Sequence, residues 1–530
     1  MRIPPLPPAR TWPTYFPARL LPISPDRNMI RKAMGRKLLT NPILCDQFVR
    51  SMKIRQGEIV IESYAGTGAL TRSLISGGNS VKEAENWLSQ RSQEQVGMQG
   101  DNTTTTKGKG KSKKTYPIWI DDLPSSSKSD TNVQGKEVNI AERVELVEPK
   151  LVVASEGSLE LLVRSFDHPS TSNSILSSIG RETSTDPYMR PVPVTKTPLN
   201  ANLLLSHSTA YVWPTLPKIL QDPLVSENLP IHDPTLPPGE ECTKRSWEDP
   251  EPPITIVCQV PDSSIGEQLV SQWVGSAVGD PGQKRTWIWE WGRIRLALLC
   301  GRSLYDRIVA PPGSIIHCKL SILSQALFDI VPLPPYHHVL NVDKQSKMTK
   351  DRPLKAASII PPSTEEPIGV PSNPPSSAHD IIKPMNGQRT LTYPLDFYPP
   401  ITSAQRSIGT PLERPELLGI MLVPKLRSPI LASQKDAWDF VMRRLFVRDT
   451  LTVKQGIPNL SFGAETLIEF IQGKNQFRGI PVDGGRVIRD LRVEEWLRIV
   501  DVFDQWAFKP DNLILDSGSA DETSREVGQD

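Results

Sequence analysis

Two glycines that follow a short apolar run are the first residues of this sequence with an evident chemical use. Residues 58–71, EIVIESYAGTGALT, predict a buried strand, a turn containing Gly66 and Gly68, and the start of a helix. Glycines in such a turn let the backbone approach a nucleotide-like ligand at the carboxyl end of a sheet. A tight turn without a ligand is the alternative, so the turn alone does not establish that a ligand binds here.

A carboxylate closes the second predicted strand. Residues 144–149, VELVEP, end in Glu148 and a proline. Nucleotide-binding α/β domains place a carboxylate at this point, where it accepts hydrogen bonds from the ribose hydroxyls. A strand-end acid facing water fits the pattern equally well. Taken together, the glycine turn and Glu148 favour a nucleoside ligand.

Further short apolar runs predict the elements that position these residues. Residues 254–260 and 294–300 read as a third and a fourth strand, and helical segments separate the runs. This alternation predicts an α/β fold with a parallel sheet covered on both faces. From residue 438 onward apolar residues recur at helical spacing, as they do again from 493 to 503, so a small helical domain is expected to close the chain.

Polar and proline-rich stretches interrupt this pattern, and the chain holds 52 prolines. Such stretches bury too little apolar surface to fold, so we expect them to be disordered insertions. The expected organisation is a basic N-terminal arm at 1–33, an α/β domain at 34–337 with insertions at about 89–139 and 221–253, a low-complexity insertion at 338–390, a C-terminal part with the helical domain at 391–510, and an acidic tail at 511–530.

Charge and cysteine content exclude several classes of protein. The net charge of +2 arises from 61 basic and 59 acidic residues, so bulk charge does not indicate a nucleic-acid binder and local patches must carry that argument. Five cysteines without short paired spacing argue against a disulfide framework and a zinc site, so we expect reduced thiols and no metal. Apolar runs are too short to cross a bilayer, and we expect no membrane contact.

The first 37 residues hold basic side chains against a single acid, Asp26. This bias is typical of mitochondrial presequences, although the many prolines weaken the prediction because presequences are normally amphipathic helices. A flexible basic arm is the alternative.

Several motifs, in order, resemble those of the ribosomal RNA adenine N6-dimethyltransferases. GRKLL at 35–39, followed by NPILCDQFV, resembles the family's G-Q-N-F-L opening, and residues 62–71 resemble its E-x-G-P-G-x-G-x-L-T motif. QVPD at 259–262 falls where the family has N-L-P-Y. Later segments, APPGS at 310–314 and the helices around 440–448 and 491–506, resemble its remaining signatures. The resemblance implies a Rossmann-like, S-adenosylmethionine-dependent methyltransferase fold with a small C-terminal helical domain.

Departures from these motifs bear on function. In methylating members an asparagine accepts a hydrogen bond from the adenine amine, and an aromatic residue stacks on the flipped base. Here these positions hold Gln259 and Asp262, and a carboxylate offers no stacking face. Tyr64 replaces the first motif glycine. A tyrosine at this position resembles the motif of the fungal mitochondrial transcription factor 1 branch. We therefore assign no catalytic residue.

The resemblance implies a mitochondrial, matrix-located transcription initiation factor, expected to be a monomer, that partners the mitochondrial RNA polymerase and binds promoter DNA. The alternative is an active dimethyltransferase of small-subunit ribosomal RNA, and a third hypothesis is a cofactor-binding but inactive ribosome-assembly factor. Whether S-adenosylmethionine binding survives stays open. The residues that would bind it are Leu39, Tyr64, Gly66, Gly68, Glu148 and Gln259.

Two further features have a functional and a structural interpretation. Arg443, Arg444 and Arg448 would contact nucleic-acid phosphates, or would form a solvated helix face. The alternating tryptophans of RTWIWEWGR would offer a stacking face to single-stranded nucleic acid, although such residues more often pack inside a fold.

Overall fold

The computed structural model describes most of the expected folded part of the chain. The described residues are 3, 6, 12–16, 36–84, 147–166, 192–197, 199–231, 243–279, 285–334, 397–398, 417–474 and 476–513. The insertions expected at 89–139 and 338–390 lie outside them, as do most of the N-terminal arm and all but the first three residues of the acidic tail.

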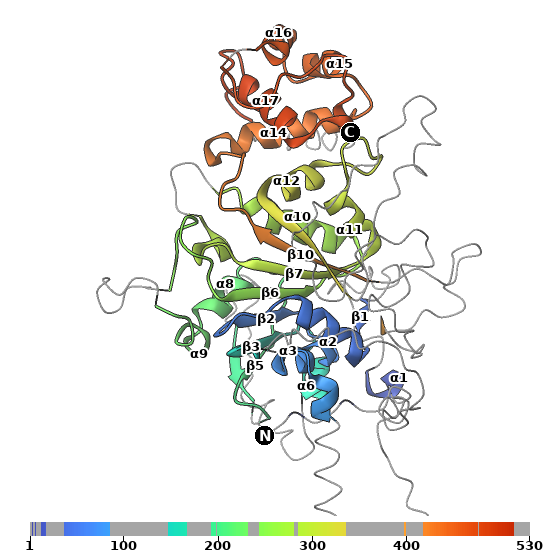
Figure 1. Ribbon diagram of the computed structural model, residues 1–530, viewed down its shortest axis with the longest axis vertical. Coiled ribbons are helices and arrows are strands. Elements are labelled where there is room, and N and C mark those ends of the chain that lie inside the picture. Colours follow the sequence, from blue (N-terminus) through green and yellow to red (C-terminus); the bar gives the residue numbers. More distant parts are fainter. Residues whose placement is uncertain are drawn as a thin grey trace, which may run out of the picture.

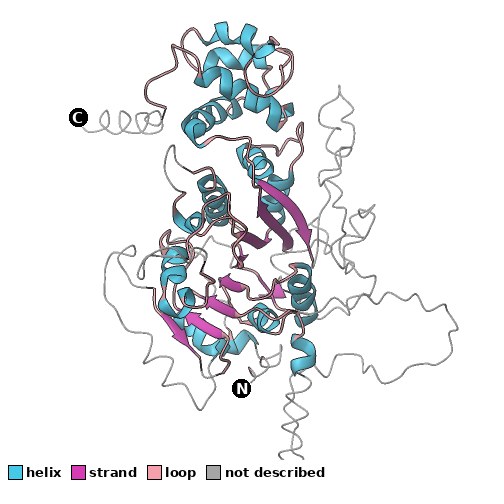
Figure 2. Ribbon diagram, turned by 60° about the vertical axis from the view of Figure 1, so that its left-hand side comes forward, coloured by secondary structure: helices cyan, strands magenta, loops and turns pink. Residues whose placement is uncertain are grey.

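A twisted sheet forms the centre of the molecule (Figure 2). Its strand order is β4-β5-β3-β2-β6-β7-β10-β8. Strands β5, β3, β2, β6 and β7 run parallel, whereas β4 and β10 are antiparallel to their neighbours. The strands are β2 (Ile59–Ser63), β3 (Leu151–Ser155), β4 (Val194–Lys196), β5 (Leu203–Ser206), β6 (Ile254–Gln259), β7 (Arg295–Cys300), β8 (Phe328–Leu333) and β10 (Leu418–Pro424).

This topology confirms the predicted Rossmann-like fold. The chain proceeds outward from β2 through β3 to β5, and then returns to build β6 and β7 on the other side of β2. The strand order therefore reverses between β2 and β6. In open α/β sheets, ligands bind outside the carboxyl ends of the strands at such a switch point. The central strands β2, β3, β6 and β7 are buried along their whole length, as parallel strands covered on both faces must be.

Three of the four predicted strands are confirmed, and the second is wrong. The observed strand, β3, begins at Leu151, after the predicted segment 144–149. Every residue of the run LVVAS is buried, whereas Glu148 is exposed before the strand begins. Strand β3 pairs directly with β2 in the middle of the sheet, where both faces are covered. The mostly apolar run LVVAS is better suited to burial there than the charged run VELVEP.

Helices lie on both faces of the sheet (Figures 1 and 2). Helix α2 begins at an asparagine cap, where the Asn41 side chain accepts a hydrogen bond from the backbone N–H of Ile43, and Pro42 occupies the first turn. The helices are α2 (Pro42–Ser51), α3 (Ala69–Ile75), α6 (Leu159–Phe166), α8 (Thr215–Gln221), α9 (Pro223–Ser226), α10 (Ser264–Ser276), α11 (Arg302–Val309) and α12 (Lys319–Leu327), with the 3-10 helix η3 (Trp287–Glu290).

The expected helical domain closes the described chain and lies at one end of the long axis (Figure 1). Its two longer helices pack together: Phe440 of α14 stacks on Phe503 of α17, with ring centroids 5.4 Å apart. The domain comprises η7 (Ala432–Gln434), α14 (Lys435–Phe446), α15 (Val453–Gly456), η8 (Ile457–Asn459), η9 (Ala464–Thr466), α16 (Leu467–Gln472), η10 (Ile488–Asp490) and α17 (Val493–Asp504). Strand β10, which precedes this domain, belongs to the central sheet.

Part of the N-terminal segment packs into the fold, which corrects the expectation of a flexible arm for those residues. Helix α1 (Trp12–Tyr15) lies against β9 (Phe397–Tyr398), which pairs with β1 (Leu38–Leu39) in a separate small sheet. Trp12 is 3% exposed, and the Tyr398 hydroxyl donates to the Phe16 carbonyl over 2.5 Å. The buried aromatic rings account for the difference.

The insertion expected at 221–253 is also ordered where the structure describes it. Helix α9 lies within it, and Trp247 is buried with its indole N–H donating to the Lys425 carbonyl at 3.0 Å. A tryptophan anchored in this way stabilises a segment that its polar and proline-rich composition did not predict to fold.

Candidate functional site at the carboxyl edge of the sheet

The loops at the switch point bring together a set of residues that we call the carboxyl-edge cluster: Arg36, Leu38, Leu39, Tyr64, Gly66, Glu156 and Gln259. The turn after β2 supplies Tyr64 and Gly66, and the end of β6 supplies Gln259. Strand β1 and the residues just before it complete the cluster from the other side. Of the predicted cofactor residues, the structure therefore groups Leu39, Tyr64, Gly66 and Gln259, with Gly68 two residues further on.

The turn after β2 is left-handed at three residues. The φ angles are 62° at Tyr64, 60° at Gly66 and 72° at Gly68. Glycine takes this conformation at no steric cost, whereas a tyrosine is strained there. A Cβ atom on Gly66 would overlap the side chain of Leu38, lying 2.8 Å from its Cδ2. The close approach that the glycine permits is therefore taken by Leu38, a residue of the chain itself.

Glu156, rather than Glu148, stands at the end of the second strand. It directly follows β3, is 3% exposed, and accepts a hydrogen bond from the Gly66 backbone N–H at 2.9 Å. Glu148 lies at the opposite end of β3, next to the backbone of Gly77, so its predicted place at the carboxyl end is wrong. The sequence signal for Glu156 was the run LVVAS that precedes it, which is apolar except for Ser155.

An arginine from the segment before β1 neutralises Glu156. Arg36 Nη2 lies 2.6 Å from Glu156 Oε2 and Nη1 lies 3.4 Å from Oε1, and both side chains are almost fully buried. The guanidinium carbon also lies 5.1 Å from the centre of the Tyr64 ring. Removing one partner of such a buried pair costs about 3–5 kcal/mol, because the other charge remains buried and unpaired.

Tyr64 fills the space beside this ion pair. It is 8% exposed, and its hydroxyl accepts a hydrogen bond from Thr209 Oγ1 at 3.3 Å. Burial raises the pKa of the Tyr64 phenol well above its usual range, so the ring is neutral. At the position where the family motif has a glycine, this chain thus has a neutral aromatic side chain.

Gln259 is buried, and both ends of its side-chain amide form hydrogen bonds inside the protein. Its Oε1 accepts a hydrogen bond from the Leu39 backbone N–H at 2.9 Å, and its Nε2 donates to Glu62 Oε1 at 3.5 Å. The side chain is 1% exposed. It joins β1 to the end of β2, and its amide oxygen already has a donor.

Asp262 lies in the loop that follows β6; the residue is exposed to solvent, but its carboxylate group is partly covered. Its carboxylate lies against Gly301, where a Cβ atom would be 2.9 Å from Asp262 Oδ2. Partial burial, with a smaller contribution from Glu267, raises the pKa of Asp262. The structure thus places a carboxylate, and no aromatic ring, at this motif position.

The cluster does not fit a nucleoside cofactor as it stands. The ribose-binding role would belong to Glu156, but Arg36, Gly66 and the Ser158 backbone N–H occupy its two oxygens. Leu38 takes the space beside the Gly66 backbone. We therefore derive no methyl-transfer step through this site.

The family can now be assigned. A family model described as ribosomal RNA adenine dimethylase matches residues 195–505, more than half of the chain. The chain belongs to the ribosomal RNA adenine dimethylase family. The resemblance read from its motifs is thereby confirmed, and the observed α/β topology is that of a Rossmann-like methyltransferase fold.

Two relatives match parts of this family member. Mitochondrial dimethyladenosine transferase 1 of Bos taurus is 28% identical over 110 residues, which cover 21% of this chain and 29% of that protein. Mitochondrial transcription factor 1 of Lachancea kluyveri is 21% identical over 248 residues, 47% of this chain and 55% of that protein. The matched segments cover less than two thirds of either relative.

Two solved structures are also similar at low identity. A dimethyladenosine transferase from Plasmodium falciparum has a TM-score of 0.34 and 11% identity, covering 87% of this chain and 95% of that one. The 23S rRNA methyltransferase ErmE has a TM-score of 0.34 and 9% identity, covering 87% and 97%. The fold of this chain is assigned from its own sheet topology.

The tryptophans of RTWIWEWGR are structural, so their interpretation as a stacking face is wrong. Trp287, Trp289 and Trp291 are 5%, 1% and 1% exposed, and the first two lie in the 3-10 helix η3. Trp287 stacks on Trp213 with ring centroids 4.2 Å apart. Rings packed in this way present no face to nucleic acid.

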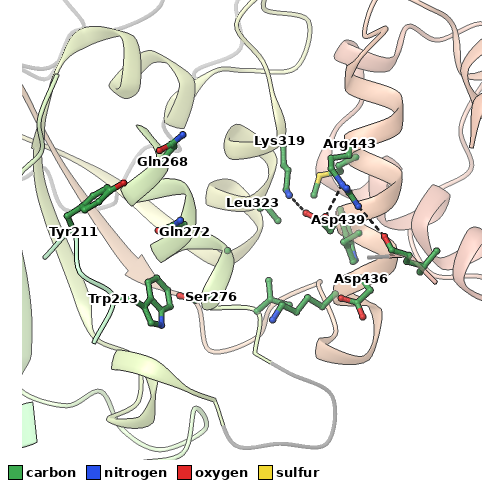
Figure 3. Close-up of a pocket in the computed structure, with 16 residues that line it drawn as sticks. Tyr211, Trp213, Gln268, Gln272, Ser276, Lys319, Leu323, Asp436, Asp439 and Arg443 are labelled. Carbon is green, nitrogen blue, oxygen red and sulfur yellow. Dashed lines mark hydrogen bonds and ion pairs between the residues drawn. The ribbon is translucent and has the colours of Figure 1, made fainter. Parts of the chain in front are cut away.

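A pocket of about 810 Å³ lies between the sheet domain and helix α14 (Figure 3). Tyr211, Gln268 and Gln272 line the sheet-domain side, and Asp439 and Arg443 line the helix side. An ion pair joins Asp439 to Lys319 across the junction, and Arg443 Nε lies 3.0 Å from Asp439 Oδ2. The pocket lies outside the carboxyl-edge cluster.

The three predicted phosphate contacts, Arg443 and Arg444 on α14 and Arg448 just after it, differ in their surroundings. Arg443 is half-buried, bound to Asp439 and to the Leu513 carbonyl at 3.1 Å. Arg444 and Arg448 are exposed, and Arg444 lies over the Phe440 ring. Among the arginines near the last helix, Arg498 is buried and donates to three backbone carbonyls. The prediction of nucleic-acid contact stays open for Arg444 and Arg448.

Within the described ranges, no three His, Cys, Asp or Glu side chains lie close enough together to hold a metal ion. The helices that the structure describes include none that is long and apolar enough to span a bilayer. Cys45, Cys258 and Cys300 are buried free thiols, and Cys318 is half-buried.

Proposed function

We propose that this chain is a mitochondrial transcription initiation factor, built on the ribosomal RNA adenine dimethylase fold, that assists the mitochondrial RNA polymerase at promoters. One observation carries the proposal: the position expected to hold a target adenine lacks both recognition groups. The amide oxygen of Gln259 is bound to the Leu39 N–H, and Asp262 replaces the aromatic ring.

Methyl transfer to an adenine amine depends on holding its nitrogen in line with the methyl group, and this positioning tolerates little misplacement. A base that loses both its hydrogen-bond acceptor and its stacking partner is not held. The chain thus keeps the fold but lacks the residues that position the target adenine. A role in binding nucleic acid, rather than in modifying it, follows from this combination.

The relatives and the N-terminal composition support the cellular setting. A protein named mitochondrial transcription factor 1 matches the longer of the two segments, and both relatives are named as mitochondrial proteins. The first 37 residues carry eight basic side chains and one acid. We propose the mitochondrial matrix as the location, where the polymerase and its promoters would be partners of this chain.

Two exposed arginines, one in the last turn of α14 and one just after this helix, are the proposed contacts to promoter DNA. Arg444, in the last turn of α14, and Arg448, two residues beyond it, are exposed to solvent, where a phosphate backbone can reach them. Each basic contact with single-stranded nucleic acid releases counterions, so its loss lowers affinity and weakens the dependence on salt.

A run-off transcription assay with the cognate polymerase tests the proposal. We expect promoter-dependent transcripts to increase several-fold when the full-length protein is added. Transcription from a template with a scrambled promoter should not change. Unchanged initiation at the true promoter would refute the proposed function.

A charge variant locates the contact. The double variant Arg444→Ala/Arg448→Ala should bind promoter DNA more weakly and reduce the slope of log K against log salt by about 1–2, because each phosphate contact contributes roughly 0.7–0.9. Lys454→Ala/Lys474→Ala removes two exposed lysines from the same domain and serves as the matched control. Equal losses in both double variants would exclude a specific role for α14.

The alternative is an active dimethyltransferase of small-subunit ribosomal RNA. The retained glycine turn and the similarity to mitochondrial dimethyladenosine transferase 1 favour it. This alternative requires that S-adenosylmethionine binds at the carboxyl-edge cluster, which in turn requires that the Arg36–Glu156 pair opens.

A further inference from the structure

The Arg36–Glu156 ion pair is unusual because it is buried and because it lies at a ligand-binding position of the fold. It lies at the point where the strand order reverses, the position at which open α/β sheets bind their ligands. The two side chains are 4% and 3% exposed, and 2.6 Å separates their closest charged atoms. A buried ion pair seldom adds net stability, so its presence at a ligand position calls for an explanation.

The hydrogen bonds around Glu156 leave little room for a sugar. Arg36 Nη2 and the Gly66 N–H donate to Oε2, whereas Arg36 Nη1 and the Ser158 N–H lie at Oε1. Ribose hydroxyls would need these same oxygens. Arg36 Nε is also buried and donates to no atom of the described residues, so the guanidinium retains an unused donor inside the protein.

Tyr64 and Leu38 hold the arginine in place. The Tyr64 ring lies beside the guanidinium at 5.1 Å, a distance at which a cation is attracted to an aromatic face. Leu38, two residues after Arg36, packs on the Gly66 backbone. The segment that carries Arg36 is thus anchored on the turn that would otherwise hold a nucleoside.

We propose that Arg36 is an internal occupant of the nucleoside position, which closes this position to any ribose-containing cofactor while the ion pair is intact. The side chain supplies two donors and a positive charge to Glu156, and a ribose diol supplies two donors without charge. An incoming nucleoside must displace the guanidinium from a buried carboxylate, and this displacement is the barrier to binding. The inference concerns the cofactor side of the fold and does not depend on a role at promoters.

Calorimetric titration of S-adenosylhomocysteine into the full-length protein tests this inference. We expect no saturable heat for the wild type up to about 1 mM ligand, and binding at least about tenfold tighter for Arg36→Ala. Arg164→Ala is the matched control, since Arg164 also pairs with a carboxylate, Glu160 at 2.7 Å, and lies 6.0 Å from the ring of Tyr15. The control should behave as the wild type does.

A competition experiment supplies a second readout. Methylguanidinium, at millimolar concentration, should refill the space vacated in Arg36→Ala and compete with S-adenosylhomocysteine, while leaving Arg164→Ala unaffected. If a thermal melt shows that Arg36→Ala is unfolded, the titration is repeated with Arg36→Met, which keeps an apolar side chain of similar length. Equal binding by the wild type and both Arg36 variants would overturn the proposal, as would the absence of binding by the folded variants.

Discussion

At the scale of single residues, Glu62 combines complete burial with an interior hydrogen-bond network. It accepts hydrogen bonds from the Thr71 hydroxyl at 2.5 Å and from Gln259 Nε2 at 3.5 Å. Burial, with a smaller contribution from Glu156, raises the pKa of Glu62 from 4.5 to about 8, and the hydrogen bonds oppose this shift only in part. Glu62 is therefore protonated in the folded protein at neutral pH.

This shift predicts a pH-dependent stability. Between pH 4.5 and 8 the unfolded chain releases the Glu62 proton while the folded protein keeps it, so the free energy of unfolding falls as pH rises through that window, by about 4–5 kcal/mol in total. Glu62→Gln should remove this decline. Denaturant unfolding at pH 5 and pH 8 measures it, with Glu494→Gln, an exposed site, as control. An identical pH slope in the wild type and Glu62→Gln would contradict the account.

Single residues of the site were predictable where the chemistry is local. The glycine turn was located because its glycines follow an apolar run, and the structure places Gly66 and Gly68 in left-handed conformations there. Arg36 was quoted within a motif but not assigned a role, because its partner Glu156 lies 120 residues away. Long-range partners of this kind are set by topology, which spacing along the chain does not reveal.

At the scale of elements, the turn between β2 and α3 shows how a backbone conformation and a neighbouring strand act together. Gly66→Ala adds a methyl group at φ 60° that also overlaps Leu38. We expect a loss of about 2–5 kcal/mol of stability, from left-handed strain of about 1–2 kcal/mol and overpacking of about 1–3 kcal/mol. Chemical denaturation measures the loss.

Gly57→Ala separates the two causes. Its φ is 75°, but no atom lies within 4 Å of the added Cβ, so only the strain of about 1–2 kcal/mol remains. If both variants lose the same amount of stability, the overlap with Leu38 does not contribute to the destabilisation of Gly66→Ala.

The elements themselves were predicted unevenly. Apolar runs located β2, β6 and β7, and helical spacing located α14 and α17. The second strand was misplaced because VELVEP precedes a better apolar run. Strand β10 was missed because it lies between a long low-complexity stretch and a helical domain, yet it pairs with β7 and β8. Pairing across such sequence distances leaves no periodic signal.

At the scale of the whole molecule, His317 connects the sheet domain to the helical domain. The side chain is 3% exposed, and its Nδ1 lies 2.8 Å from the Arg489 carbonyl oxygen. Burial lowers the pKa of His317 from 6.5 to about 4. The folded protein therefore holds a neutral imidazole at the domain junction.

Acid should weaken this junction. Between pH 6.5 and 4 the unfolded chain binds a proton at His317 that the folded protein does not, so the free energy of unfolding falls with falling pH, by roughly 2–3 kcal/mol. His317→Asn should lose this contribution to the acid slope. Thermal melts at pH 4.5 and 7, followed by tryptophan fluorescence, measure the slope. A variant as acid-sensitive as the wild type would exclude His317 as the source.

The organisation of the whole chain was predicted in outline. The patterns of apolar residues predicted an α/β fold with a parallel sheet and a closing helical domain, and the motif resemblance predicted that the sheet is Rossmann-like. The packing of α1 against β9 did not, because it joins segments separated by most of the sequence. Those contacts depend on buried aromatic rings in a proline-rich segment, whose composition alone indicated a flexible arm.

Methyl transfer tests the central claim most directly: that this member of the dimethylase family keeps the fold without the family's chemistry. The full-length protein is incubated with tritiated S-adenosylmethionine and the small-subunit ribosomal RNA helix, and label in adenine is counted against a heat-denatured control. The account predicts no incorporation above the control. Label incorporated as N6-methylated adenine would contradict it and make this chain an enzyme.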